Sequence, residues 1–263
     1  MRESGSDRSG GYDPRHYEIL SAAQDRHFWF AGRLQAIEAA LAPVVSSLPA
    51  GYRVLEVGCG TGHVLAMLER LCAGGHVVGM DLLWEGLPYA RRRTGCPLVQ
   101  GTIAGSPFAV RFDVVGLFDV VEHVDDDTAF LAQHRALLTA GGALMLTVPA
   151  HHALWSTLDE RARHCRRYSE DSLRALLERS GYRVDYLTQF MGSLYPLMWL
   201  SRQRLRWRRP ADPLKEELRI FPGLNGALTA ILGWEARRFI ARRRRLPIGT
   251  SLLAMARPVS AAE

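Results

Sequence analysis

The stretch VLEVGCGTG, residues 54–62, determines the expected fold. Its first half is apolar apart from Glu56 and is typical of a buried strand, and Gly58, Gly60 and Gly62 follow within five residues. Glycine permits backbone conformations closed to other residues and lets a ligand approach the chain closely. The next segment, 63–73, has the apolar spacing of an amphipathic helix. The stretch therefore predicts a strand, a ligand-binding turn and a helix.

Strand and helix patterns alternate along the rest of the chain. Apolar β-type segments predict strands at 52–57, 76–81, 97–101, 112–118, 141–149, 182–190 and 248–257. Helices are expected at 15–42, 63–73, 126–138 and 169–181. This alternation predicts an α/β, doubly wound and mainly parallel sheet. Residues 1–14 are polar and rich in Gly and Ser, so we expect a disordered tail rather than a signal peptide.

Charge is concentrated in one segment. The 263 residues carry a net charge of +6, but 200–247 hold thirteen basic and four acidic residues, so the remainder is slightly acidic. Lys215 is the only lysine, which excludes a Gly-Lys phosphate loop and a Schiff-base lysine elsewhere. Four scattered cysteines and the absence of a long apolar run predict a cytoplasmic protein. A peripheral position at the inner face of a membrane stays open.

The residues around the glycines limit the chemical class of the ligand. The spacing G-x-G-x-G differs from the dinucleotide fingerprint G-x-G-x-x-G, and Glu56 beside it disfavours a pyrophosphate but suits a cationic ligand. Asp81 ends the second expected strand, where a carboxylate can accept hydrogen bonds from both hydroxyls of a ribose. The loop and Asp81 together favour S-adenosylmethionine as the cofactor.

With these motifs, residues 27–257 resemble the class I S-adenosylmethionine-dependent methyltransferases, in particular the small-molecule group of quinone-biosynthesis O-methyltransferases. The resemblance implies a Rossmann-like, seven-stranded sheet with an antiparallel last strand. It implies cofactor contacts from Trp29, Arg33, Glu56, Gly58, Cys59, Gly60, Asp81, Leu82, Thr102, Ile103 and Phe118. In this family an aspartate often follows the third strand and accepts a hydrogen bond from the adenine amino group. Here Thr102 or the Ile103 backbone N–H would take its place. We expect methyl transfer, by O-methylation, to a small-molecule or lipid-like acceptor.

Two polar segments follow the fourth and fifth expected strands. Asp119, Glu122 and His123 are similar to the E-x-x-E-H triplet that is linked to a divalent metal in the quinone group. They are only weak metal candidates, because helix capping satisfies the same side chains, and we expect no resident metal. Segment 149–169, PAHHALWSTLDERARHCRRYS, resembles the acceptor-side series of the group. The expected catalytic residues are His123, His164, His152 and Asp119, with acceptor contacts from Trp155, Arg166, Arg167 and Tyr168.

The segment 190–246 is expected to be a basic helical insertion within a methyltransferase domain formed by 15–189 and 247–258. Its first helix has an apolar face flanked by arginines, and its second, around 224–245, ends in RRRR. Such helices form a lid over a pocket or lie on an anionic membrane. Two other functions stay open. One is a cofactor-binding regulatory paralogue without transferase activity, and the other is an RNA methyltransferase, for which no recognisable RNA-binding module is present.

Overall fold

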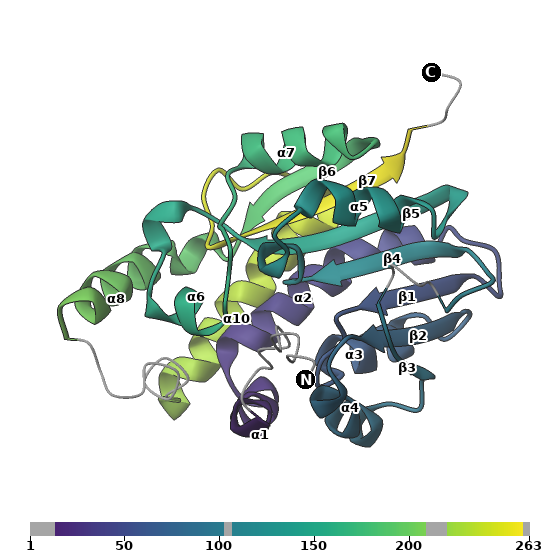
Figure 1. Ribbon diagram of the computed structural model, residues 1–263. Coiled ribbons are helices and arrows are strands. Elements are labelled where there is room, and N and C mark those ends of the chain that lie inside the picture. Colours follow the sequence, from purple (N-terminus) through teal and green to yellow (C-terminus); the bar gives the residue numbers. More distant parts are fainter. Residues whose placement is uncertain (1–13, 103–106, 209–219, 260–263) are drawn as a thin grey trace, which may run out of the picture.

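The computed structural model describes residues 14–102, 107–208 and 220–259. A seven-stranded sheet of order β3-β2-β1-β4-β5-β7-β6 forms its centre (Figure 1). The strands are β1 (Arg53–Val57), β2 (His76–Asp81), β3 (Leu98–Gln100), β4 (Phe112–Phe118), β5 (Leu138–Pro149), β6 (Tyr182–Phe190) and β7 (Ser251–Pro258). Strand β7 pairs antiparallel with β5 and β6, while β1 to β5 pair in parallel. The doubly wound α/β sheet with an antiparallel last strand is confirmed.

Helices cover both faces of the sheet because successive strand residues point to opposite sides. Val54 packs in a core cluster with residues of α2 (Phe28–Val45) and α3 (His63–Leu71). Its neighbour Leu55 belongs to the other cluster, with residues of α5 (Asp127–Arg135) and α7 (Glu170–Arg179). The shorter helices are α1 (Pro14–Gln24), α4 (Leu87–Arg93) and α6 (Thr157–Arg161).

The prediction of a single helix over 15–42 is wrong. The chain forms α1 and then α2, and the break lies at His27, whose extended backbone caps α2 while its Nδ1 accepts from the Trp29 N–H at 3.2 Å. Helix α1 turns back over the glycine loop, where the Thr61 hydroxyl donates to the Gln24 side chain at 2.5 Å. The tail expected over 1–14 lies outside the described residues except for its last position, Pro14, which begins α1.

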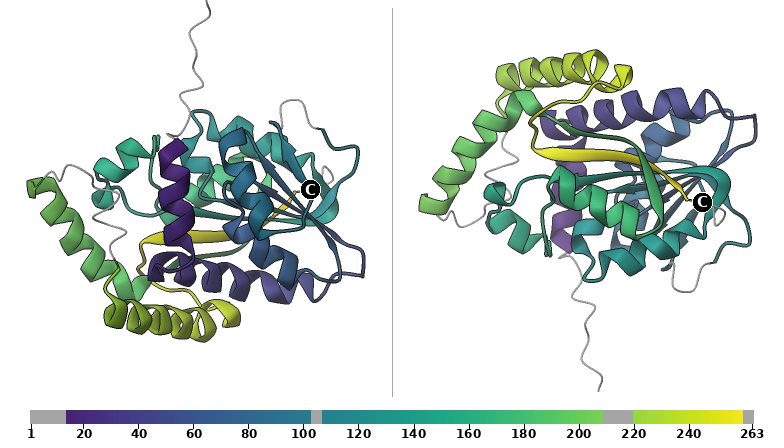
Figure 2. Two further views of the ribbon diagram at one scale, coloured as in Figure 1. Left: turned by 90° about the horizontal axis from the view of Figure 1, so that it is seen from below. Right: turned by 90° about the horizontal axis from the view of Figure 1, so that it is seen from above.

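Two helices, α8 (Tyr195–Arg208) and α10 (Pro222–Arg238), lie in the segment expected to be an insertion. Helix α10 runs alongside α2, and α8 projects beyond the body of the sheet (Figure 2). A Cβ at Gly32 of α2 would collide with Leu232 of α10, so the two helices are in close contact there. The Asn225 side chain adds hydrogen bonds of 2.8 Å, accepting from the Phe28 N–H and donating to the Arg26 carbonyl. No described helix is long and apolar enough to cross a membrane.

Candidate functional site

The turn between β1 and α3 depends on its glycines. Gly58, Gly60 and Gly62 have φ values of 75°, 51° and 77°, which other residues adopt only with strain. A Cβ at Gly58 would lie 2.5 Å from Val120, and one at Gly62 would lie 2.7 Å from the Ala90 backbone. A Cβ at Gly60 meets no described atom within 4 Å, so this part of the loop faces open space. The loop is thus packed at both ends and accessible at its centre.

Asp81, at the end of β2, closes one side of this loop. Its carboxylate accepts hydrogen bonds from the Gly60 N–H at 2.7 Å and the Leu83 N–H at 2.8 Å. Burial raises the pKa of Asp81, and these two hydrogen bonds oppose that rise. Leu82, next to it, is 64% exposed and presents an apolar surface. The arrangement offers a carboxylate and an apolar platform to a nucleoside.

Two further predicted cofactor residues follow these strands. Cys59 is buried under the loop, and burial raises the pKa of its thiol. Thr102, just after β3, is exposed. The Ile103 prediction lies outside the described residues.

At the end of β4, Arg33 of α2 meets Phe118 and Asp119. Its Nη2 donates to the Phe118 carbonyl at 2.8 Å, and its Nε lies 2.5 Å from Asp119 Oδ2. The Trp29 ring centre is 5.8 Å from the guanidinium carbon. Asp119 adopts a left-handed backbone conformation with φ of 56°, which turns the chain sharply as it leaves the strand. The fold therefore brings four predicted residues together beside the glycine loop.

Two buried glutamates lie close to this point. Glu56 is 2% exposed, and burial raises its pKa well above the usual range although Arg33 opposes the rise. Glu122 is fully buried, and burial followed by repulsion from Asp119 raises its pKa in the same way. Neither oxygen of Glu122, nor Oε2 of Glu56, has a hydrogen-bond partner among the described residues. A cationic group brought beside them would favour the ionised carboxylates again.

A cavity of about 440 Å³ is lined by the second of these glutamates, Glu122. Most of its lining is apolar and comes from the start of α2, from α6, and from α8 and α10. Its polar lining includes Asp119 and Glu122 on one side and Asp159, His164 and Arg167 on another. Such a mainly apolar cavity with a few polar groups suits a small molecule.

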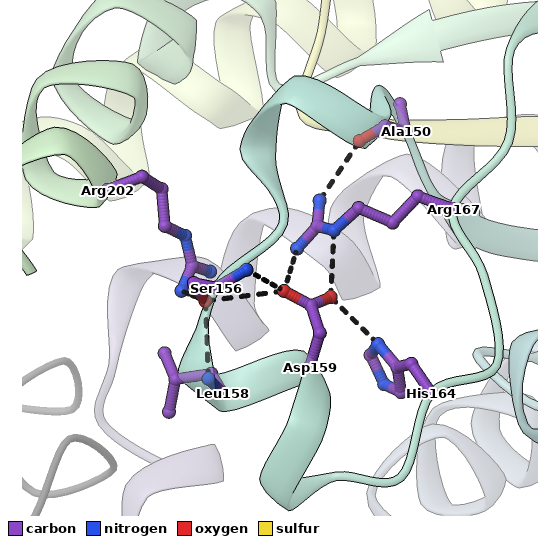
Figure 3. Close-up of polar contacts among 7 residues, drawn as sticks. All are labelled: Ala150, Ser156, Leu158, Asp159, His164, Arg167 and Arg202. Atoms are coloured by element: carbon purple, nitrogen blue, oxygen red, sulfur yellow. Dashed lines mark hydrogen bonds and ion pairs between the residues drawn. The ribbon is translucent and has the colours of Figure 1, made fainter. Parts of the chain in front are cut away.

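Asp159 of α6 is the centre of a buried polar network (Figure 3). It accepts from the Ser156 N–H at 2.8 Å, from Arg167 Nε at 2.8 Å and Nη2 at 3.1 Å, and from His164 Nδ1 at 2.9 Å. Arg202 of α8 donates to the Ser156 hydroxyl at 2.5 Å and so joins α8 to the network. Burial disfavours the charge of Asp159, but the bonds from His164 and Arg167 outweigh it and hold the pKa well below its usual range.

His164 and His123 form the imidazole pair of the site. Their ring centres are 4.7 Å apart with the planes nearly perpendicular. Because Asp159 is ionised, Nδ1 of His164 carries the proton and a neutral ring keeps a lone pair on Nε2. The surrounding protein and the neighbouring His164 lower the pKa of His123 to about 4, so that its ring is neutral at neutral pH.

Other predicted residues lie in different surroundings. Arg166 and Tyr168 both bind Asp127 at the start of α5, at 2.7 and 3.0 Å, and the Tyr168 side chain is buried. These contacts stabilise the loop, and an acceptor contact from either stays a prediction. His152 is exposed, with its ring 5.8 Å from that of the half-buried Trp155.

Asp159 was expected only as one of the polar groups of segment 149–169, with no role of its own, and Ser156 and Arg202 were not predicted as site residues. The S-x-x-D spacing of 156–159 marks a capping box and was a usable signal for pairing Ser156 with Asp159. The contact made by Arg202 joins residues 46 positions apart, which local spacing does not show.

The possible metal ligands differ from the expected triplet. Glu122, His123 and His164 each place one potential ligand atom within 4.8 Å of the others. Asp119, the third member expected, pairs with Arg33 instead. The sharp turn at Asp119 and the return of segment 163–168 across η3 (Val121–His123) bring His164 into this group.

Comparison with known proteins agrees with the fold and the loop. Residues 22–187 match the family described as "Methyltransferase domain". The ubiquinone biosynthesis O-methyltransferase of Xanthomonas axonopodis pv. citri is 32% identical over 186 residues, covering 63% of this chain and 75% of that enzyme. The enzyme of the same name from Cereibacter sphaeroides (strain ATCC 17025) is 37% identical over 101 residues, 36% of this chain and 40% of that protein. The chain thus spans well under two thirds of this second relative.

Solved structures show the same fold. The plantazolicin methyltransferase BamL, in complex with a triazolic desmethylPZN analog and SAH, superposes with a TM-score of 0.60 at 13% identity, covering 94% of this chain and 92% of that one. The sheet, the glycine loop and these matches define a class I, Rossmann-like methyltransferase. The chain belongs to the Methyltransferase domain family.

Proposed function

We propose that this enzyme transfers a methyl group to a hydroxyl oxygen of an apolar small molecule bound in the 440 Å³ cavity, with His164 as general base. The relatives named as ubiquinone biosynthesis O-methyltransferases support an oxygen acceptor. The apolar lining supports a small or lipid-like molecule over a nucleobase, which would need more polar partners.

Residues at the ends of β1, β2 and β4 would hold the cofactor. The open backbone at Gly60, the carboxylate of Asp81 and the apolar surface of Leu82 fit a nucleoside, and the buried Glu56 fits a cationic neighbour. Arg33 is placed to bind a carboxylate once it exchanges its present partners. When bound there, S-adenosylmethionine would supply an electrophilic methyl group on a sulfonium, for transfer to the acceptor oxygen with the C–S electron pair left on sulfur as a thioether.

The Asp159–His164 pair is the observation that carries the proposal. Asp159 fixes Nδ1 of His164 as the protonated nitrogen, so Nε2 is free to accept the acceptor's hydroxyl proton as its oxygen bonds to the methyl carbon. The buried carboxylate then stabilises the imidazolium that forms. Arg167 holds Asp159 from the other side and keeps this carboxylate in position. The apolar walls exclude water from the reacting groups.

The test compares His164→Gln and Asp159→Asn with His152→Gln, an exposed histidine outside the network. Transfer of labelled methyl to the small-molecule fraction of a cell extract measures turnover, and calorimetry measures cofactor affinity. We expect the first two variants to bind cofactor normally and lose turnover by about 10²-fold or more, as for a missing base. Normal turnover of His164→Gln would overturn the assignment. Cofactor binding by the wild type without transfer to any acceptor would favour the regulatory paralogue.

Added chelator separates a base from a metal at Glu122, His123 and His164. A base alone predicts unchanged turnover after dialysis against chelator. Loss of turnover that an added divalent ion restores would instead assign these three residues to a metal.

A further inference from the structure

The two faces of α10 are both apolar. Leu232 and Ala236 of α10 are buried towards α2, and so is Ile240, which lies just beyond the end of the helix. On the opposite face, Ile231 is 43% exposed and Trp234 is 53% exposed. A surface helix normally presents polar side chains on its outer face, so a second apolar face marks a contact surface.

Helix α8 repeats this feature. Leu197, Trp199 and Leu200 are each 46–47% exposed, and Phe221 and Leu224 at the start of α10 are more than half exposed. Leu197, Phe221 and Leu224 also line the 440 Å³ cavity. The exposed apolar residues of α8 and α10 are here called the α8–α10 surface, and three of them also line the cavity.

The exposed charged side chains described in segments 191–203 and 220–248 are all basic. Arg237 and Arg238 are exposed at the end of α10, and the exposed run 242–245 follows. The described residues of 191–203 and 220–248 include one acidic side chain, Glu235, which is 3% exposed and accepts from the N–H groups of Gly192 and Ser193. Exposed cations thus adjoin an apolar surface on which the described residues place no exposed carboxylate.

We propose that the α8–α10 surface docks on an anionic lipid bilayer, with the mouth of the cavity at the membrane. Trp199 and Trp234 would lie at the level of the headgroups, where indole rings are favoured. The arginines would bind the anionic headgroups, and the exposed leucines and isoleucine would enter the acyl boundary. Charge complementarity and the continuity with the cavity favour lipid over a purely polar partner. The docking does not depend on the methyl-transfer chemistry.

Co-sedimentation with vesicles tests the charge requirement. The full chain should bind phosphatidylcholine vesicles that contain phosphatidylglycerol at least about tenfold more tightly than pure phosphatidylcholine, and should be released as salt rises. Replacing Arg242, Arg244 and Arg245 by Gln should weaken binding at least about tenfold. The matched control replaces Arg111, Arg135 and Arg179, exposed arginines outside this surface, and removes the same charge. Equal weakening by both triple variants would overturn the proposal, because net charge alone would then explain binding.

Tryptophan variants test the apolar part. Trp199→Ser with Trp234→Ser should weaken vesicle binding several-fold, whereas Trp84→Ser, at a tryptophan 61% exposed in η1 (Trp84–Gly86), should not. Absence of vesicle binding by the wild type would refute docking. A concentration-dependent dimer lost in the Trp234 variant would assign the surface to a second copy of the chain. Unchanged cofactor affinity in each variant shows that the fold is intact and keeps this test separate from that of His164.

Discussion

The variant Asp159→Asn tests the polar network most directly. The Asp159 carboxylate is 1% exposed and takes two hydrogen bonds from Arg167, whose side chain is only 7% exposed. Asparagine would leave that guanidinium buried without a counter-charge, although its bond to the Ala150 carbonyl remains. Removing one partner of a buried ion pair costs about 3–5 kcal/mol. Urea denaturation followed by circular dichroism should show a loss of this size at neutral pH.

The pH dependence gives this prediction a second part. His164 and Arg167 hold the folded-state pKa of Asp159 below its unfolded value, so the carboxylate stabilises the fold fully above the unfolded pKa of about 4. That stability is lost as the pH falls towards the folded pKa. The difference in the free energy of unfolding between the wild type and Asp159→Asn should therefore shrink as the pH falls below about 4.

A matched control is the carboxylate of Asp185, which also faces two arginines but is 31% exposed. It lies 2.8 Å from Arg257 and 3.3 Å from Arg183, and Asp185→Asn should cost less than about 1 kcal/mol. The reasoning fails if Asp159→Asn costs no more than this control, or if its cost is the same at every pH.

The other three tests concern a glycine of the loop, a buried histidine and a contact between α10 and α2. Gly58→Ala should weaken S-adenosylmethionine binding at least about tenfold in calorimetry because its Cβ would meet Val120, while Gly141→Ala, with no atom within 4 Å, should bind normally; equal affinities would contradict this. Burial lowers the pKa of His134 to about 4, so the unfolded state binds more protons and stability should fall as pH drops from about 6.5 to 4; His134→Gln should flatten that slope in urea denaturation, and an unchanged slope would be evidence against it. Asn225→Ala removes two backbone contacts and should lower the free energy of unfolding by about 1–2 kcal/mol; no loss would mean that α10 holds α2 by apolar packing alone.

The strands were predictable because each is a short apolar run between turn residues. The break between α1 and α2 was missed although four polar residues, 24–27, stand there, because a polar turn by itself does not end a helix. What fixes the start of α2 includes Asn225, which accepts from the Phe28 N–H across 197 positions of sequence. A contact of this range leaves no local signal, so a single helix was the natural reading of that segment.

For the candidate site, the sequence predicted the residue types better than their directions. Asp81 and Phe118 lie at one edge of the sheet because the parallel strands β2 and β4 end there, and Arg33 of α2 reaches the Phe118 carbonyl at that edge. In contrast, segment 166–168 is extended beside Ala150, and alternate side chains of an extended chain point to opposite sides. Residues 166 and 168 therefore turn to Asp127, while 167 turns to Asp159. The order of letters alone does not show which side faces the cavity.

The contact between Gly32 and Leu232 links positions that lie 200 residues apart. Gly32 adjoins Arg33, whose guanidinium binds the end of β4, so a displacement of α10 that moves α2 would also move the Arg33 backbone. In a library of variants, alanine at 32 should be tolerated where 232 is also reduced in size and rejected where it is leucine. Substitutions at positions 32 and 232 are thus expected to be coupled. A design that changes the outer surface of α10 must therefore choose the residues at both positions together.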